Sequence, residues 1–384
     1  MADLPRQLGR YLLLERIATG GSAEIYRGLH ESGGIQRLVA IKCVHAAHAD
    51  NESFLKFFRS EINLTLGFNH PGIVRTLDFG EEDGRPFIVF EYVHGRSLRQ
   101  ITDRLSEQKK MMPISLATFI CEQAAGALHY AHDFQEPVTG RVLNVIHRDI
   151  SPQNIMVSYD GVPKLIDFGI AKVLQDGDRT IAGFIKGKPA YLSPEQAAGT
   201  PLDARSDVFA LGIVLWELLA GRRLFGGPHD KQFIMEAIVD PAFAIDPPSK
   251  HDRRVPQTLD EIALRALERD RDRRFQSARD MQTALWKLLS AASRHGYVRK
   301  AALLMSQTFA QEIEEEAQGL KRLSTVAEEL TNSTIDEASW LIPMPKKRFE
   351  KADEVDDLAR KPKSSGEDFT YSTNLIQRKL DEKA

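Results

Sequence analysis

Two aspartates and an asparagine carry the clearest chemical signal in this sequence of 384 residues. Asp149 lies in the stretch VIHRDISPQN, Asn154 closes that stretch, and Asp167 opens the tripeptide DFG. Each short motif would arise by chance in many soluble proteins, but their order and separation are those of a phosphoryl-transfer site. Such a site uses one carboxylate for a proton and another for magnesium. The sequence therefore predicts phosphoryl transfer.

The same residues resemble those of the protein kinase family. The stretches GGSAEIYRG and SPEQ are similar to bacterial kinases of the eukaryotic-like (Hanks-type) serine/threonine class. The resemblance implies that Asp149 accepts the proton of a substrate hydroxyl, and that Asn154 and Asp167 hold Mg²⁺ or Mn²⁺ on ATP. It also implies an α+β, bilobal fold with a small β-rich N-lobe, a larger helical C-lobe and a C-terminal helical extension.

A lysine and a glutamate are expected to form an ion pair in the N-lobe. Lys42 ends the stretch VAIK and matches the family lysine that contacts the α- and β-phosphates. Glu61 lies in a stretch with helical spacing, nine residues before His70, as in the family's C-helix. A solvated lysine, and a helix that packs on the sheet for stability alone, are the alternatives.

The predicted phosphate-binding loop departs from the family pattern GxGxxG. It joins two alternating, strand-like stretches, 11–17 and 24–29, and it reads ATGGSA, with alanines at the first and third glycine positions. Because glycine lets backbone amides approach phosphates closely, we expect a stiffer loop that binds nucleotide less tightly. The ATP-binding residues expected here are Ile17, Ala18, Thr19, Gly20, Gly21, Ser22, Ala23 and Ile25.

A buried strand at 87–90 runs into EYVHG, which resembles the hinge between the lobes. The resemblance implies that the backbone carbonyl of Glu91 and the amide of Val93 face the adenine, and that Phe90 narrows the back of the pocket. Core packing explains apolar side chains equally well when each is taken alone. The side chains expected to sandwich the adenine ring are Ile25, Ala40 and Met156.

Two residue types have exchanged places relative to serine/threonine kinases. Ser151 stands two residues after the catalytic aspartate, where lysine is usual, and Lys188 follows Gly187, where threonine is usual. We hypothesise that Lys188 supplies the ammonium that stabilises the transferring phosphoryl group and that Ser151 supplies the hydroxyl. A solvated loop lysine and a neutral serine are the alternative, because one sequence does not demonstrate coupling.

Other polar residues are given regulatory or structural roles by the resemblance. Arg148 is positioned to pair with a phosphorylated residue of the activation segment, and Thr180 is the candidate for that phosphate. An exposed loop threonine is an equal alternative for Thr180. Asp207 would bond the backbone of the catalytic loop, and Arg274 would pair with Glu195.

The activation segment, 168–195, closes with SPE and favours a protein substrate over a small molecule. Pro152 favours serine or threonine as acceptor. A pseudokinase scaffold that recruits partners is the rival interpretation. The altered glycine loop and the missing lysine favour the scaffold, whereas the retained Lys42 and catalytic carboxylates favour the enzyme.

Composition limits the remaining classes of protein. Charged residues make up 27% and the formal net charge is −3, so we expect no general attraction to nucleic acid or anionic lipid. The sequence has no apolar signal core and no run of about 18 apolar residues, which argues against a membrane partner. Cys43 and Cys121 lack metal or redox spacing, which favours the reducing cytoplasm.

An apolar stripe in 301–330 predicts a helix that docks on the kinase, binds a partner or self-associates. Together these observations predict the following domains: an N-terminal arm, 1–10; a kinase domain, 11–289, divided into an N-lobe, 11–90, a hinge, 91–95, and a C-lobe, 96–289; a helical extension, 290–331; and a polar, disordered tail, 332–384.

Overall fold

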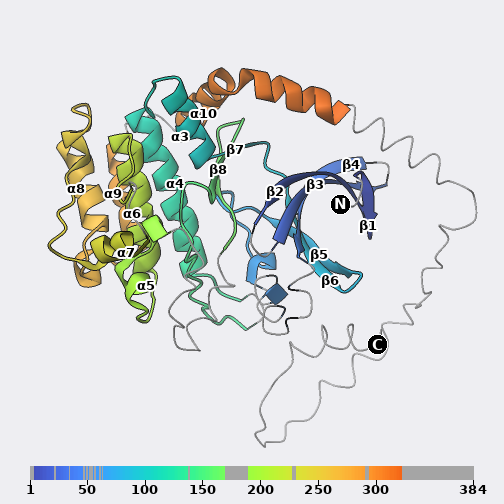
Figure 1. Cartoon of the computed structure of the whole chain (residues 1–384), viewed down its shortest axis with the longest axis horizontal. Helices are drawn as coiled ribbons and strands as arrows, with labels where there is room; N and C mark the ends of the chain where they lie inside the picture. Colours follow the sequence, from blue (N-terminus) through green and yellow to red (C-terminus); the bar gives the residue numbers. More distant parts are fainter. Residues whose placement is uncertain are drawn as a thin grey trace, which may run out of the picture. The chain divides into compact units, whose positions relative to one another are not determined.

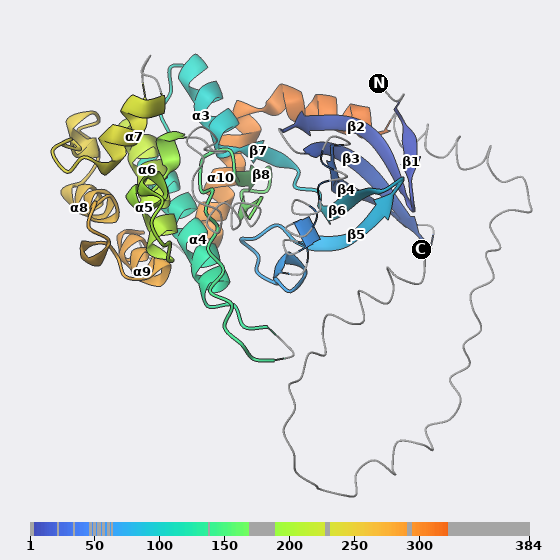
Figure 2. The same cartoon turned by 60° about the horizontal axis from the view of Figure 1, so that its bottom comes forward.

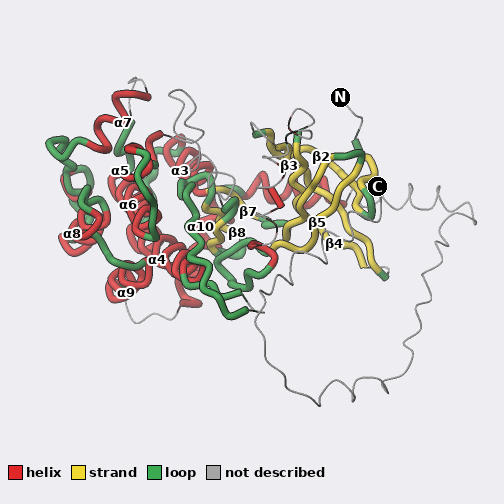
Figure 3. The backbone as a smooth tube through the Cα atoms, turned by 90° about the horizontal axis from the view of Figure 1, so that it is seen from below, coloured by secondary structure: helices red, strands yellow, loops and turns green. Residues whose placement is uncertain are grey.

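The computed structural model describes residues 4–20, 23–33, 35–45, 48, 51, 55, 58–59, 62, 64–136, 139–168, 189–226, 231–289 and 294–321. Its strands gather mainly in an N-terminal lobe and its helices in a C-terminal lobe (Figure 1 and Figure 3). The bilobal α+β fold that the sequence predicts is thereby confirmed.

The N-lobe contains one antiparallel sheet of six strands in the order β1-β2-β3-β4-β6-β5. Alternating apolar residues turn one face inward, where Leu13, Ile41 and Val89 are fully buried. The strands are β1 (Arg6–Leu8), β2 (Tyr11–Thr19), β3 (Ala23–Ser32), β4 (Ile35–Val44), β5 (Thr76–Glu82) and β6 (Arg85–Glu91).

Strand β1 belongs to the stretch that the sequence predicts to be an N-terminal arm. It pairs with residues 11–13 of β2 through a turn at Gly9, which has a φ of +53°. The arm therefore adds an edge strand to the sheet. Three residues are too few for an alternating pattern to stand out in the sequence.

The stretch predicted to be a helix between β4 and β5 is helical at the residues the structure describes within 55–66. Phe58 and Ile62 pack against Val44 and Ile88 of the sheet, which buries all four side chains. Glu61 lies outside the described residues, so its predicted ion pair stays a prediction.

The C-lobe is built around α6, whose side chains are buried on nearly every side. Serine residues begin three of its helices with capping boxes, namely Ser97, Ser193 and Ser277. The helices are α3 (Leu98–Glu107), α4 (Ile114–His132), α5 (Pro194–Ala198), α6 (Arg205–Ala220), α7 (Lys231–Val239), α8 (Gln257–Ala266) and α9 (Ala278–Leu288), with 3-10 turns η2 (Pro189–Tyr191), η3 (Pro248–Lys250) and η4 (Arg271–Arg273).

A second, three-stranded antiparallel sheet follows the hinge. It consists of β7 (Gly95–Ser97), β8 (Ile155–Ser158) and β9 (Pro163–Leu165), in that order. A Cβ atom at Gly95 would lie 2.2 Å from the carbonyl oxygen of Val157, so glycine is required for β7 to approach β8. Because β7 follows the hinge and β8 follows the stretch 145–154, which we call the catalytic loop, this sheet brings the end of that loop close to the end of the hinge.

Residues 294–321, which we call the docked extension, form α10 (Arg294–Thr308) and a further helical stretch at 310–321. The helix α10 begins inside the predicted helical extension, 290–331, and ahead of the apolar stripe at 301–330. The rest of 290–331 and the tail, 332–384, lie outside the described residues. Figure 1 and Figure 2 both show the docked extension, in orange, running from the C-lobe toward β2.

The docked extension packs tightly on the C-lobe. The ring of Tyr297 stacks on Phe119 of α4 at 5.7 Å between centroids, and Met305 and Phe309 are almost fully buried. A Cβ atom at Gly161, which has a φ of +85°, would lie 2.0 Å from the carbonyl oxygen of Val298. For the described part of the predicted stretch, 301–321, docking on the same chain is observed.

None of the helices in the described part of the chain combines the length and the apolar character that a membrane crossing requires. Cys43 and Cys121 are both free cysteines. Burial raises the pKa of the Cys43 thiol to about 11 and also raises the pKa of Cys121, so both thiols favour the protonated, unreactive form.

Candidate active site

A cavity of about 590 Å³ lies between the N-lobe sheet and the hinge. Most of the residues predicted from the sequence to contact ATP line this cavity. They are Ile17, Ala18, Ile25, Ala40, Lys42, Phe90, Glu91, Val93 and Met156, and Asp167 joins them.

Strand register explains how these residues reach one face. Ile25 lies opposite Ala18 on one side and opposite Lys42 on the other, across β2, β3 and β4. Ala40 lies two residues before Lys42 and faces Phe90. Because side chains alternate along a strand, all five point to the same side of the sheet. The apolar ceiling of the cavity and its lysine therefore follow from a single register.

Lys42 pairs with Asp167 at the inner end of the cavity. The Nζ atom of Lys42 lies 3.0 Å from Oδ1 of Asp167, and their side chains are 18% and 34% exposed. Asp167 has a φ of +55°, a left-handed conformation that is costly for a residue with a side chain and is common at functional sites. The neighbouring Phe168 is buried against His147 and Phe68, which holds the aspartate in place.

The catalytic loop closes on itself through Asn154. The side-chain Nδ2 of Asn154 donates to the backbone oxygen of Asp149 at 2.8 Å and to its Oδ2 at 2.9 Å. The backbone of Asn154 accepts a hydrogen bond from Ile166, the residue before Asp167, at 3.0 Å. These bonds bring Asp149, Asn154 and Asp167 together, although they come from two separate motifs.

The donor set suits a magnesium ion that arrives with a nucleotide. The carbonyl oxygen of the Asn154 side chain makes no hydrogen bond within the described part of the chain, and Asp167 adds a carboxylate nearby. The described residues contain no cluster of three or more side chains that could hold a metal by themselves. Mg²⁺ commonly binds through one or two protein oxygens plus substrate phosphates and waters, so Asn154 and Asp167 fit this role.

The family model described as "protein kinase domain" matches residues 11–286 of this chain. The chain belongs to the protein kinase family. It is 34% identical to tyrosine-protein kinase MasK of Myxococcus xanthus over 291 residues, 76% of this chain and 44% of that protein. It is 36% identical to serine/threonine-protein kinase PrkC of Bacillus subtilis over 275 residues, 71% of this chain and 40% of that protein.

A solved structure supports the same assignment. The kinase domain of PknI from Mycobacterium tuberculosis matches with a TM-score of 0.56 and 26% identity, covering 75% of this chain and 99% of that chain. The matched part of this chain spans less than half the length of the curated relatives.

The buried Asp207 binds the backbone of the catalytic loop through hydrogen bonds. Asp207 is 1% exposed and accepts hydrogen bonds from the backbone of His147 at 2.7 Å, the backbone of Arg148 at 2.9 Å and Nε2 of His132 at 2.8 Å. Burial acts to raise the pKa of Asp207, but the bonds with the two histidines outweigh it and leave this pKa lowered. Since Arg148 has a φ of +66°, these bonds also hold a strained backbone.

The predicted pair of Glu195 and Arg274 is present and buried. Two guanidinium nitrogens of Arg274 lie 2.6 and 3.1 Å from the two carboxylate oxygens, with the side chains 0% and 10% exposed. Arg274 also donates to the backbone oxygens of Glu268 and Arg269. Burial acts to raise the pKa of Glu195, but Arg274 more than offsets this, so the pKa is lowered.

Other predicted residues do not line the cavity or are not described. Thr19 ends β2, Ala23 begins β3, and the amide of Gly20 donates to the backbone oxygen of Ala23. These three residues lie outside the cavity lining. Ser151 is fully buried in the catalytic loop. The predicted residues that lie outside the described part of the chain are Gly21, Ser22, Glu61, Thr180 and Lys188.

Several residues of the cavity were not predicted from the sequence. Strand alternation beside the predicted residues could have found Glu15 and Arg27, and Ile166 directly precedes the predicted Asp167. No sequence pattern indicates Glu316, which comes from the docked extension. The other unpredicted lining residues are Arg16, Val74, Tyr92, Gly95, Arg96, Ser97 and Gln100.

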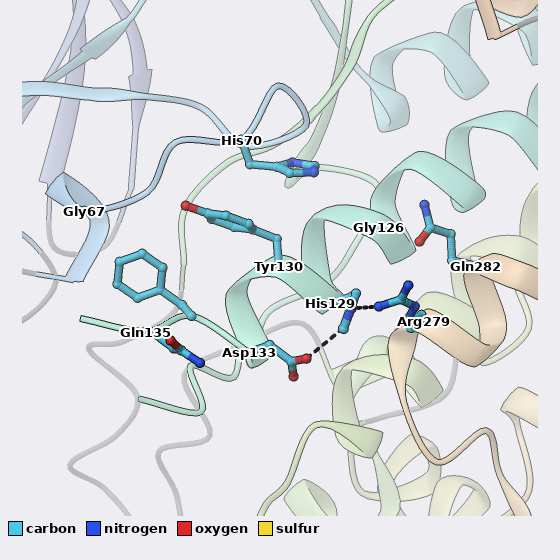
Figure 4. A pocket seen from close by; sticks show the side chains of 10 residues that line it. Gly67, His70, Gly126, His129, Tyr130, Asp133, Gln135, Arg279 and Gln282 are labelled. Atoms are coloured by element: carbon cyan, nitrogen blue, oxygen red, sulfur yellow. Dashed lines mark hydrogen bonds and ion pairs between the residues drawn. The ribbon is translucent and has the colours of Figure 1, made fainter. Parts of the chain in front are cut away.

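A second cavity of about 710 Å³ lies between α4 and α9 (Figure 4). His129 bridges Asp133 at 3.5 Å and Arg279 at 3.4 Å along its wall, and Tyr130 stacks on His70. Neither the lysine nor the carboxylates of the catalytic motifs reach it. Although this cavity is larger, its lining does not provide the groups that phosphoryl transfer requires.

Proposed function

We propose that the chain is an ATP-dependent protein kinase that transfers the γ-phosphoryl group to serine or threonine of protein substrates. The observation that carries this proposal is the convergence of Lys42, Asp167, Asn154 and Asp149 beside a cavity of nucleotide size. In the cell we expect the kinase to act in cytoplasmic signalling and to phosphorylate itself.

In the proposed reaction, Lys42 binds the α- and β-phosphates and keeps the γ-phosphorus in line with the incoming hydroxyl. Asp149 accepts the hydroxyl proton while the oxygen bonds to the γ-phosphorus and the bond to the bridging oxygen of ADP breaks. Asn154 fixes the carboxylate of Asp149 through its 2.9 Å hydrogen bond. Magnesium held by Asn154 and Asp167 would neutralise charge on the triphosphate.

The acceptor residue is tested directly by phosphoamino-acid analysis. The full chain is incubated with γ-labelled ATP, magnesium and a peptide library, beside an Asp149→Asn control that excludes contaminating kinases. We expect label on serine and threonine. One relative is named a tyrosine-protein kinase, so label on tyrosine alone would contradict the proposed acceptor. Absence of label above the control would contradict the kinase itself.

A scaffold that binds nucleotide without turnover is the second candidate, which the two alanines of the glycine loop favour. The experiment above separates the two, because a scaffold would bind ATP and leave every peptide unlabelled. Retention of Lys42, Asp149, Asn154 and Asp167 favours the enzyme.

The exchange of Ser151 and Lys188 adds a finer proposal, in which Lys188 provides the ammonium that the catalytic loop lacks. Removing a charge next to the transferring phosphoryl group costs roughly 10²-fold or more in turnover. We therefore expect Lys188→Ala and Lys188→Thr to lose most of the activity, measured as initial rates at saturating ATP. Near-normal rates in both variants would remove the proposal.

Regulation through Thr180 is proposed on the same footing. Arg148 lies directly before the catalytic aspartate, and a guanidinium can bind phosphate with two hydrogen bonds. We expect Thr180→Ala to autophosphorylate more slowly than the parent, measured from the time course of label incorporation. Equal rates would contradict this switch.

A further inference from the structure

The docked extension reaches the cavity that we assign to the nucleotide. Glu316 lies well beyond residue 286, the last residue that the family model matches, yet it lines the cavity together with Ile17 of β2 and Tyr92 of the hinge. One wall of this cavity therefore comes from a segment outside the kinase domain.

Two ion pairs and an aromatic side chain anchor Glu316. Its Oε1 lies 2.5 Å from Nη1 of Arg96, and both side chains are 18% exposed. One helical turn earlier, Glu312 pairs with Arg104. The guanidinium groups of Arg96 and Arg104 both lie over the buried ring of Phe309, at 5.6 and 5.3 Å from its centroid. The position of Glu316 is thus set by several independent contacts.

One carboxylate oxygen of Glu316 remains available for a ligand. Oε1 forms the ion pair with Arg96 and also accepts a hydrogen bond from the hydroxyl of Tyr159 at 3.2 Å. Oε2 has no hydrogen-bond partner among the residues that the structure describes. A cavity-lining carboxylate of this kind can accept hydrogen bonds but cannot donate them.

The chemistry of ATP limits what this oxygen could bind. The hydrogen-bond donors of ATP are the adenine amino group and the two ribose hydroxyls. The triphosphate is negatively charged, so a carboxylate would repel it. The amino group is expected at the backbone of Glu91 in the hinge, and the triphosphate is expected at Lys42. The ribose hydroxyls are the donors that remain.

We propose that Glu316 binds the ribose hydroxyls of ATP, so that the docked extension completes the nucleotide site of this kinase. The proposal rests on the proposed function in taking ATP as the nucleotide. It makes Glu316 a residue that selects ribonucleotides over nucleotides without sugar hydroxyls.

The test compares ATP with 2′,3′-dideoxy-ATP, which lacks both hydroxyls. Equilibrium Kd values are measured for the full chain, for Glu316→Gln and for Glu315→Gln, a control one residue away whose side chain is exposed and pairs with Gln311. In Glu316→Gln the amide oxygen stays with Arg96, which only donates, and the amide NH₂ faces the ligand. We expect the parent and the control to bind ATP about tenfold more tightly than the dideoxy analogue, and Glu316→Gln to lose most of this preference, because a neutral amide bonds a hydroxyl more weakly than a carboxylate does.

A second measurement needs no variant. ATP should slow amide hydrogen exchange in residues 310–321 more than the dideoxy analogue does, at equal saturation. An unchanged ratio of Kd values in Glu316→Gln, or equal protection by both nucleotides, overturns the inference. If the Kd values for the two nucleotides differ as expected but none of the three proteins transfers phosphate, the proposed function fails and the role of Glu316 stands. If phosphate is transferred but the ratio of the two Kd values is unchanged in Glu316→Gln, the role of Glu316 fails and the proposed function stands.

Discussion

Two residues of the candidate active site have backbone conformations that neighbouring residues stabilise against their own preferences. Asp167 and Arg148 both adopt left-handed backbone conformations, and neighbouring contacts hold them there. Next to Asp167, the ring of Phe168 packs on His147, and the backbone amide of Arg148 donates a hydrogen bond to Asp207. Strain of this kind is expected where geometry serves function.

The buried His147 should make stability depend on pH. Burial lowers the pKa of His147 below the ordinary value of 6.5, although the nearby Asp207 acts in the opposite direction. The unfolded chain therefore takes up a proton before the folded chain does. Folding stability should be independent of this histidine above about pH 7.5 and should fall as the pH drops below 6.5.

Urea unfolding between pH 7.5 and 5.5 checks this expectation. The parent should lose stability over this range, and His147→Gln should show a shallower slope because the buried titrating group is gone. Parallel slopes for the two proteins would contradict the assigned cause.

The proposed catalytic residues could be found in the sequence because they lie in short motifs that resemble those of protein kinases. Asp149 and Asn154 lie in one stretch, and Lys42 ends a strand-like stretch. Glu316 was not predictable. In the sequence it is one of several acidic residues in a helix, and its role depends on Arg96, which is distant in the chain.

At the scale of elements, capping and burial hold the C-lobe around the catalytic loop. The capping box of Ser193 starts α5 and presents Glu195 to Arg274, while Gln196 of the same box donates to the backbone oxygen of Arg148. A short helix therefore links the end of the activation segment to the catalytic loop.

Loss of Arg274 should destabilise the protein. Arg274→Met leaves the carboxylate of Glu195 buried without its partner, which typically costs about 3–5 kcal/mol. The matched control is Arg273→Met, because Arg273 has a side chain that is 69% exposed and only a 3.5 Å pair with Glu268. Denaturant unfolding should show a large loss for the first variant and a small one for the second. Equal losses would mean that burial of the pair is unimportant.

Element boundaries were harder to predict than element types. The strands around the glycine loop and the buried α6 follow from their periodicity, whereas β1 is too short to show one. The contacts of α10 with α4, such as that of Tyr297 with Phe119, could not be predicted because they join residues far apart in the sequence.

At the scale of the whole molecule, the docked extension joins the outer face of the C-lobe to the nucleotide cavity. Its packing and its nucleotide contact should therefore be coupled, because a ligand that binds only the docked state stabilises docking. The described residues thus include a regulatory candidate that the kinase domain alone does not contain.

Phe309→Ala tests this coupling. Removing a buried phenylalanine typically costs about 3–5 kcal/mol, and here the loss should fall on docking. We expect faster amide exchange in 310–321 and a higher Kd for ATP. Leu303→Ala is the control, since Leu303 lies on α10 with 56% exposure. An unchanged Kd together with faster exchange would separate the docked extension from the nucleotide site.

We propose above all that Asp149 is the base that accepts the acceptor hydroxyl's proton during transfer of the γ-phosphoryl group. Single-turnover phosphoryl transfer by the parent and by Asp149→Asn, with the Kd for ATP measured in parallel, tests it most directly. We expect the substitution to lower the rate about 10²- to 10⁴-fold while the Kd stays within about twofold. Equal rates in the two proteins would contradict it.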